Sequence, residues 1–111
     1  MTSFKQGDIL LTEVKFSDGS GIKKRPVLVI SNDKYNSVRD EIIFLAITSN
    51  TKRILPGDFI VKDWQSAGLL KESMISAITQ TISKKLLIKK LGALNKIELK
   101  NCLKYFAGVI A

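Results

Sequence analysis

KRPVLVIS, residues 24–31, is the stretch that decides the fold class of this chain. Two charged side chains lead into Pro26, and four apolar residues then follow without a break. A short unbroken apolar run bounded by polar residues is typical of a strand that is buried on both faces. We therefore predict an inner strand of a sheet over residues 26–31.

Segments on both sides of this strand also have strand character. Gly7 and Asp8 precede a first predicted strand at 9–16, which ends in the turn-rich loop 17–21. Downstream, the pattern predicts a polar loop with a helical turn at 32–40, strands at 41–48, 58–62 and 73–78, a turn at Pro56-Gly57 and a short helix at 63–68. The stretch 86–94 fits either a strand or a helix.

The last part of the chain has a helix pattern. Asn95, with Glu98 three positions later, resembles a capping box with Asn in place of Ser or Thr. Apolar residues then recur at helical spacing: Leu99, Cys102, Leu103, Phe106 and Ile110. Because no repeat, low-complexity stretch or linker interrupts the chain, residues 1–111 are predicted to form one mainly β domain. We expect a barrel or sandwich of strands packed on the C-terminal helix.

Composition restricts the partners. Among 111 residues, 18 Lys and Arg stand against 10 Asp and Glu, a net charge of +8, which favours nucleic acid, an acidic protein segment or a membrane surface. Packing on the sheet explains the apolar helix face without lipid, so we expect no membrane partner.

Neither a signal-like beginning nor a run of membrane-spanning length is present, which favours a cytoplasmic location. The single cysteine, Cys102, has the position of a buried hydrophobe rather than a nucleophile.

The missing residue types restrict the chemistry. The chain contains no histidine, which removes the usual general base near neutral pH and the commonest nitrogen ligand of metals. The carboxylates are scattered and no glycine-rich phosphate loop occurs, so we expect neither a metal nor a cofactor. Cleavage of RNA can run on the remaining side chains, because the ribose 2′-hydroxyl is a nucleophile already beside the phosphate that it attacks. An arginine can then bind the phosphate through its planar fork.

Three pieces of the sequence, in order and at fitting spacing, resemble the PemK/MazF family of toxins. KQGDIL at residues 5–10 is similar to the family's opening Gly-Asp strand, KRPVLVISND at 24–33 to its Arg-Pro strand, and AITS at 46–49 to the end of its third strand. The resemblance spans about residues 5–83. It implies a small SH3-like barrel or twisted antiparallel sheet with a C-terminal helix. It also implies a metal-independent endoribonuclease that cleaves single-stranded RNA into 2′,3′-cyclic phosphate and 5′-hydroxyl ends.

The same resemblance implies a cleavage site at Arg25 and Thr48, where Arg25 stabilises the phosphorane charge and Thr48 positions the phosphate. From the residues alone, Arg25 is a solvated charge beside a buried strand, and Thr48 is a strand-end residue whose hydroxyl bonds the backbone. Ser49, Lys23 and Lys24 are candidate RNA contacts beside this pair. The alternative is an ordinary turn serine and a solvated basic loop.

The segment around residues 77–83 departs from the family pattern. Many members carry an acidic residue, a Gln and a basic residue there, whereas this chain has Ala77, Ile78 and Gln80. Base preference and activity can therefore differ, and Gln80 is the candidate RNA contact of this segment. From Lys84 onward, seven Lys accompany one Glu. The basic run 84–90 is either a solubilising face or a second RNA contact.

The expected partners also follow from the resemblance. It implies a homodimer with a basic groove near Arg25 and Thr48, and an antitoxin whose acidic, disordered tail occupies that groove. DNA would be contacted only through the antitoxin complex. Two-fold pairing is the commonest way for a small domain to cover an apolar face. A non-catalytic alternative of the same fold stays open: a toxin of the kind that binds DNA gyrase and cuts nothing, or a module that only binds nucleic acid. A pure binder does not need Arg25 with Thr48.

Overall fold

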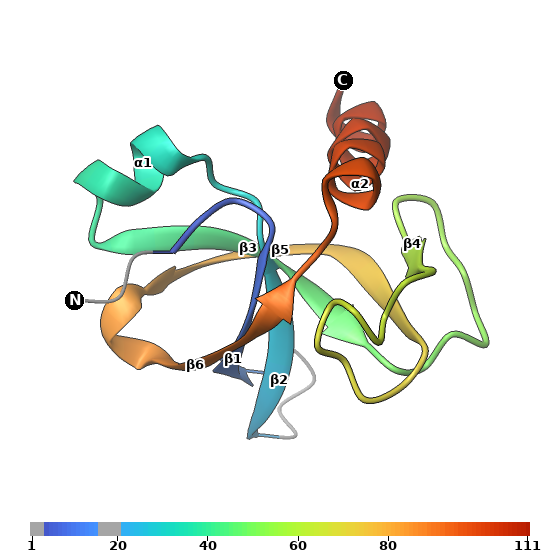
Figure 1. Cartoon of the computed structure of the whole chain (residues 1–111), viewed down its shortest axis with the longest axis horizontal. Helices are drawn as coiled ribbons and strands as arrows, with labels where there is room; N and C mark the ends of the chain where they lie inside the picture. Colours follow the sequence, from blue (N-terminus) through green and yellow to red (C-terminus); the bar gives the residue numbers. More distant parts are fainter. Residues whose placement is uncertain (1–3, 16–20) are drawn as a thin grey trace.

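The computed structural model describes residues 4–15 and 21–111, and in this part of the chain six strands form one antiparallel sheet. The strands are β1 (Asp8–Lys15), β2 (Ile22–Val29), β3 (Glu41–Thr48), β4 (Phe59–Val61), β5 (Ser73–Ser83) and β6 (Leu87–Ala93), in the order β4-β5-β3-β2-β1-β6. The remaining elements are α1 (Asp33–Val38), the 3-10 turn η1 (Lys84–Leu86) and α2 (Lys96–Ile110). Figure 1 shows the sheet curled on itself with α2 beside it, which confirms the mainly β prediction.

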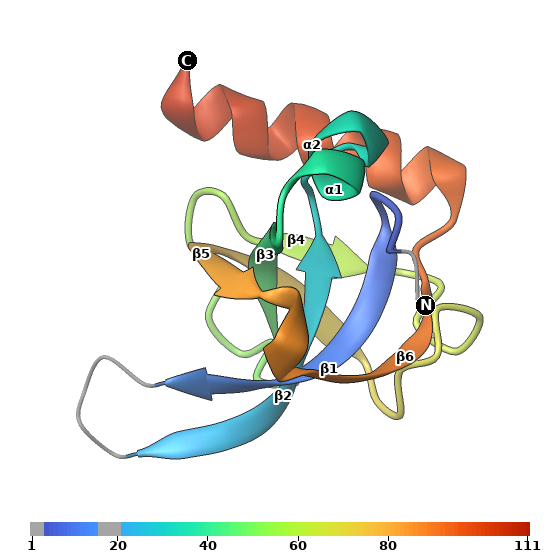
Figure 2. The same cartoon turned by 90° about the vertical axis from the view of Figure 1, so that its left-hand side faces the viewer.

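Strand β2 is buried on both faces, as its apolar run predicts. Val27, Leu28 and Val29 are each 0% exposed. Since side chains alternate along a strand, Leu28 joins the core that also contains Cys102 of α2, whereas Val27 and Val29 join a second core around Phe44. The sheet therefore carries one core on each face. Beyond this centre, residues 22–24 are exposed, and the β1–β2 hairpin extends away from the body (Figure 2).

Strand β5 bends the sheet at a bulge. It pairs with β3 at Leu45↔Thr79 and again at Ile47↔Ile75, so three residues of β5 lie opposite one residue of β3. Extra residues in one strand increase the local twist and bend the pair. Past the bulge, the first part of β5 also pairs with β4 through Phe59↔Ile75. The bend thus turns the β4 edge back toward the rest of the sheet.

Helix α2 begins as the capping pattern predicts. The backbone N–H of Glu98 donates to the Asn95 side chain at 2.8 Å. The Glu98 carboxylate is 8% exposed and accepts hydrogen bonds from the backbone N–H groups of Lys62 and Asp63, at 2.9 and 3.0 Å. One carboxylate therefore joins the first turn of the helix to the chain that follows β4. No helix among the described residues has the length and apolar character needed to cross a bilayer.

The chain after β4 packs closely on the other edge strand, β6. A Cβ atom at Gly68 would lie 2.2 Å from the carbonyl oxygen of Leu91, and one at Gly92 would lie 2.2 Å from the carbonyl oxygen of Ala67. Only glycine at both positions allows the two backbones to approach this closely. Because β4 and β6 are the two edges of the sheet, this contact closes the curl.

Most predicted elements are confirmed, with differences at their limits. The segment 41–48 is β3, the helical turn within 32–40 is α1, and the turn at 56–57 is present. Strand β2 begins four residues before the predicted strand, β5 continues to Ser83, and the ambiguous stretch 86–94 contains β6. The short helix predicted at 63–68 is wrong, because these residues form turns that end at Gly68 with φ +88°. Phe16 and the loop residues 17–20 lie outside the described residues.

The glycine contact leads to a stability prediction for Gly68→Ala. Both Gly68 and Gly21 have positive φ, but no described atom lies within 4 Å of the position of a Cβ at Gly21. Left-handed backbone costs either alanine variant about 1–2 kcal/mol. Gly68→Ala should lose about 1–3 kcal/mol more, because its methyl group meets the β6 backbone. Urea unfolding followed by the fluorescence of the single tryptophan, Trp64, measures both variants. Equal losses would contradict the close contact.

Candidate functional site

Arg25 lies where β2 enters the core. It is half-buried and pairs with Thr12 of β1, which is 0% exposed. The Thr12 hydroxyl donates to the carbonyl oxygen of Leu86 at 3.2 Å. The backbone that carries the guanidinium is therefore held by neighbouring strands, which restricts the positions that the side chain can reach.

Thr48 is the last residue of the neighbouring strand β3. The ladder between β2 and β3 ends at Val27↔Ala46, and Arg25 and Thr48 each lie two residues beyond this pair on their own strands. The Thr48 hydroxyl accepts a hydrogen bond from the backbone N–H of Asn50 at 3.1 Å. This is the local bond expected of a strand-end threonine. A hydroxyl that accepts in this way keeps its own O–H as a donor for a ligand.

A cavity of about 460 Å³ opens beside Arg25. Arg25 and Pro26 line it from β2, and Ile47 and Ser49 line it from the two positions that flank Thr48. Thr48 itself is not among the lining residues. The floor is apolar, with contributions from Leu11, Leu69 and Leu91. The structure thus brings Arg25 and Ser49 to one cavity, and Thr48 lies between two residues that line it.

The other predicted RNA contacts lie at different places. Because side chains alternate along β2, Lys23 shares a face with Arg25, whereas Lys24 lies on the opposite face and pairs in register with Glu13. Gln80 pairs with Phe44 and lines a separate cavity of about 320 Å³. Contact of these residues with RNA stays a prediction, and none of the three is among the residues that line the Arg25 cavity.

Two lysines that no local sequence pattern connects also line the Arg25 cavity. Lys71 comes from the chain between β4 and β5, and Lys89 comes from β6. Lys89 belongs to the basic run noted above, but nothing local to the sequence indicates that Lys71 lies close to it. The sequence feature that accounts for their proximity is the pair of glycines Gly68 and Gly92, whose close contact brings these two segments together.

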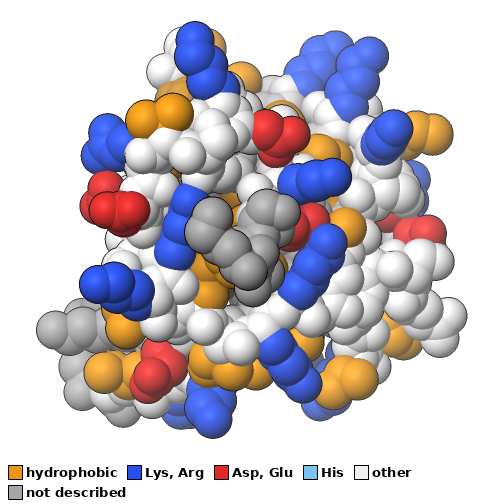
Figure 3. All heavy atoms as spheres, turned by 60° about the vertical axis from the view of Figure 1, so that its left-hand side comes forward, with side chains coloured by type: hydrophobic (Ala, Val, Ile, Leu, Met, Phe, Trp, Pro, Cys, Tyr) orange, Lys and Arg blue, Asp and Glu red, His pale blue; other side chains and the backbone are white. Residues whose placement is uncertain are grey.

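Positive charge is spread over one face of the molecule. Figure 3 shows Lys and Arg side chains distributed across one whole face rather than gathered into a single patch.

The buried thiol of Cys102 is 2% exposed, and burial, with a smaller contribution from the charge of Glu98, raises its pKa to about 12. A thiol with this pKa stays protonated near neutral pH, so the expectation that Cys102 is a core residue is confirmed.

Solved structures share this fold over nearly their whole length. An endoribonuclease from a mycobacterial species matches with a TM-score of 0.79 at 18% identity, covering 99% of this chain and 93% of that one. An endoribonuclease in complex with its cognate antitoxin, also mycobacterial, matches with a TM-score of 0.77 at 18% identity, covering 99% and 95%. The MazE-MazF complex of Deinococcus radiodurans matches with a TM-score of 0.76 at 16% identity, covering 100% and 98%. Identities this low establish the fold alone.

Family comparison gives a more direct assignment. No curated protein sequence matches the chain at a significant level. A family model does match, over residues 5–110, and this range contains all three segments that carry the resemblance. Since the match covers almost the entire chain, the protein belongs to the family of PemK-like, MazF-like toxins of type II toxin-antitoxin systems.

Proposed function

We propose that the chain is a toxin endoribonuclease that cleaves single-stranded RNA at the Arg25 cavity. The observation that supports this proposal is that Arg25 and Ser49 line one cavity, with Thr48 between the two lining residues Ile47 and Ser49. Support comes from the family and from neighbours of the same fold that are described as endoribonucleases. A module that only binds would not need a guanidinium and a hydroxyl held on adjacent strands.

The chemistry follows from the substrate. The ribose 2′-oxygen attacks the adjacent phosphorus and forms a new O–P bond while the bond from phosphorus to the 5′-oxygen breaks. The 2′-hydroxyl loses its proton and the leaving 5′-oxygen gains one, so the products are a 2′,3′-cyclic phosphate and a 5′-hydroxyl. Arg25 supplies two N–H donors and a permanent charge to the phosphorane oxygens. Deprotonating a guanidinium is too costly for Arg25 to serve as the base.

Thr48 and Ser49 act as hydrogen-bond donors in this proposal. The Thr48 hydroxyl is oriented by its bond from Asn50, which fixes the oxygen and leaves the hydrogen for a phosphate oxygen. The turn that follows is held in place as well, because the Thr51 hydroxyl donates to Glu72 at 3.3 Å. Since the substrate brings its own nucleophile and Arg25 supplies the cation, we propose that the reaction needs no metal ion.

An antitoxin is the proposed protein partner. A neighbour of the same fold is described in complex with its cognate antitoxin, and the net charge of +8 would attract an acidic, disordered segment. In this arrangement the toxin acts in the cytoplasm, and DNA is reached only through the antitoxin complex.

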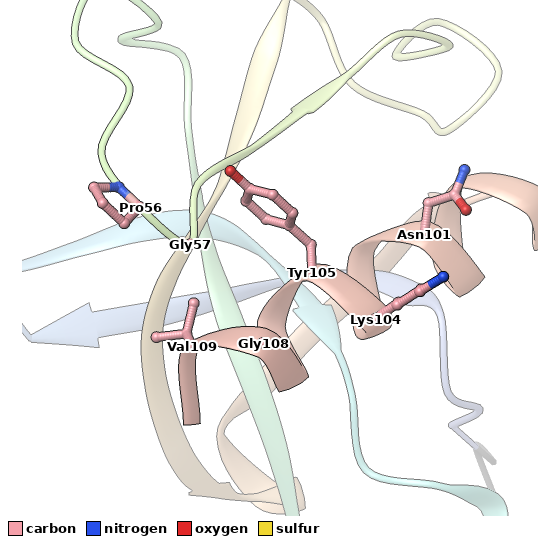
Figure 4. Close-up of a pocket in the computed structure, with 7 residues that line it drawn as sticks. All are labelled: Pro56, Gly57, Asn101, Lys104, Tyr105, Gly108 and Val109. Atoms are coloured by element: carbon pink, nitrogen blue, oxygen red, sulfur yellow. The ribbon is translucent and has the colours of Figure 1, made fainter. Parts of the chain in front are cut away.

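A homodimer is proposed on the basis of an exposed apolar surface around the end of α2. Tyr105 and Val109 extend from the helix toward the Pro56-Gly57 turn, where they line a cavity of about 460 Å³ (Figure 4). A Cβ at Gly57 would meet Ala77 at 2.8 Å and Val109 at 3.1 Å, so helix, turn and β5 adjoin one another. Further large apolar side chains are exposed on the same three segments: Ile54, Leu55, Ile78 and Ile110. A second copy would cover this surface by two-fold pairing.

The catalytic proposal predicts that Arg25→Ala loses cleavage while the fold is kept. Removing one preorganised donor to a developing oxyanion costs about 10²–10³ in rate. Lys100→Ala, which removes an exposed charge on α2, is the matched control and should cleave like the parent. Cleavage of a mixed single-stranded RNA pool, measured with EDTA present and with the 5′-hydroxyl ends sequenced, tests activity, chemistry and specificity together.

Two outcomes would change the catalytic proposal. Loss of parental cleavage on adding EDTA would refute the metal-free mechanism. Growth arrest that survives Arg25→Ala, with no RNA cleavage by either protein, would favour a non-catalytic toxin of the gyrase-binding kind.

The dimer proposal predicts that Ile110→Glu dissociates the protein whereas Ile97→Glu does not. Both isoleucines lie on α2 and are similarly exposed, 73% and 75%, but they are about 20 Å apart along the helix at 1.5 Å per residue. A charge at position 110 would be buried without a partner in the interface, which is strongly unfavourable. Light scattering measures the mass of each variant. A parent protein that is a monomer at micromolar concentration would refute the dimer.

A further inference from the structure

Lys71 and Lys89 have no part in the proposed bond cleavage, yet both line the Arg25 cavity. Their side chains are exposed, and within the described residues neither forms an ion pair. Lys90, the neighbour of Lys89, differs because its ammonium group lies 3.1 Å from the carboxylate of Asp8. One lysine of β6 is thus paired within the protein, while the next one borders the cavity.

The backbone at Lys71 is fixed on both sides. Before it, Gly68 packs against β6 at Leu91. After it, the hydroxyl of Ser73, which is 4% exposed, donates to the carbonyl oxygen of Lys71 at 2.9 Å. Glu72 accepts the bond from Thr51 in the turn beyond Thr48. Lys71 is therefore held relative to both β6 and the proposed catalytic turn.

Lys89 is placed by the sheet itself. It lies opposite Leu11 of β1, which in turn lies opposite Pro26 of β2, the residue after Arg25. Arg25 and Lys89 are therefore two strands apart, with the apolar side chain of Leu11 between them on the cavity floor. Three cations from three separate segments therefore border the Arg25 cavity, whose floor is made of leucine, isoleucine and proline side chains.

An apolar floor bordered by cations fits one class of ligand. A nucleotide of a single strand has a flat, weakly polar base and a charged phosphate on each side. A volume of about 460 Å³ lies in the range of pockets that hold small organic groups. We propose that this cavity is a nucleotide subsite in which the unstacked base lies on the leucine floor. Lys71 and Lys89 bind the phosphates next to the one that is cleaved, and this inference rests on the proposed function.

The direct test is the salt dependence of RNA binding. Each phosphate contact on a single strand contributes about 0.7 to the slope of log K against log salt. Lys71→Gln and Lys89→Gln should each weaken binding and reduce that slope by about 0.7, and the double variant by about 1.4. Arginine at either position should restore the slope, because the charge is what matters. Lys100→Gln, on the exposed face of α2, should leave it unchanged.

The probe is a fluorescein-labelled single-stranded RNA of mixed sequence, with binding measured by anisotropy in an Arg25→Ala background that does not cut it. The same lysine variants with Arg25 intact should raise KM and change kcat little. If the variants show the predicted slopes but the parent protein never cleaves RNA, the subsite is supported and the nuclease proposal is refuted. Cleavage by the parent with unchanged KM and slope in both lysine variants refutes the subsite and leaves the nuclease proposal standing.

Discussion

Strand β2 buries consecutive side chains on opposite faces of the sheet. Val27 and Val29 lie in one core, and Leu28 lies in the other. Burying three such side chains contributes about 5–9 kcal/mol at 1.5–3 kcal/mol each, which is comparable to the whole net stability of a small domain. A strand buried in this way needs a neighbour on each side and cover on each face. Strands β1 and β3 are the neighbours, and the curl of the sheet together with α2 supplies the cover. The rest of the structure satisfies these requirements.

The candidate site lies where this burial stops. Arg25 precedes the buried part of β2, and Thr48 is the last residue of β3, next to Ile47, which is 2% exposed. Side chains that directly adjoin a packed core keep their positions at little cost, because their backbone is already ordered by the strand ladder. A guanidinium and a hydroxyl held this way lose little further entropy when a phosphate binds, which is the advantage of building a site on rigid elements.

Local pattern was sufficient for much of this architecture but not for the cavity. Residues 26–31 and 41–48 carry their strand character in their own side chains, and Asn95 with Glu98 carries the start of α2, so these elements could be predicted. Residues 63–68 form turns instead of the predicted helix, and Gly68 at their end packs closely on β6. Lys71 reaches the site through that same packing. A contact between residues more than twenty positions apart leaves no periodic trace in a single sequence, so the cavity wall opposite Arg25 could not be predicted.

Cys102 gives this molecule an intrinsic reporter of its own motions. It is the single thiol of the chain, it lies on the buried face of α2, and its raised pKa, about 12, keeps the reactive thiolate scarce near neutral pH. Alkylation therefore requires α2 to separate from the sheet, because only then does the thiol regain water and an ordinary pKa. The labelling rate in the unmodified protein thus measures the free energy of that opening. A ligand that binds only the closed form slows the reaction as its occupancy rises, so protection of one sulfur atom reports the binding of such a ligand.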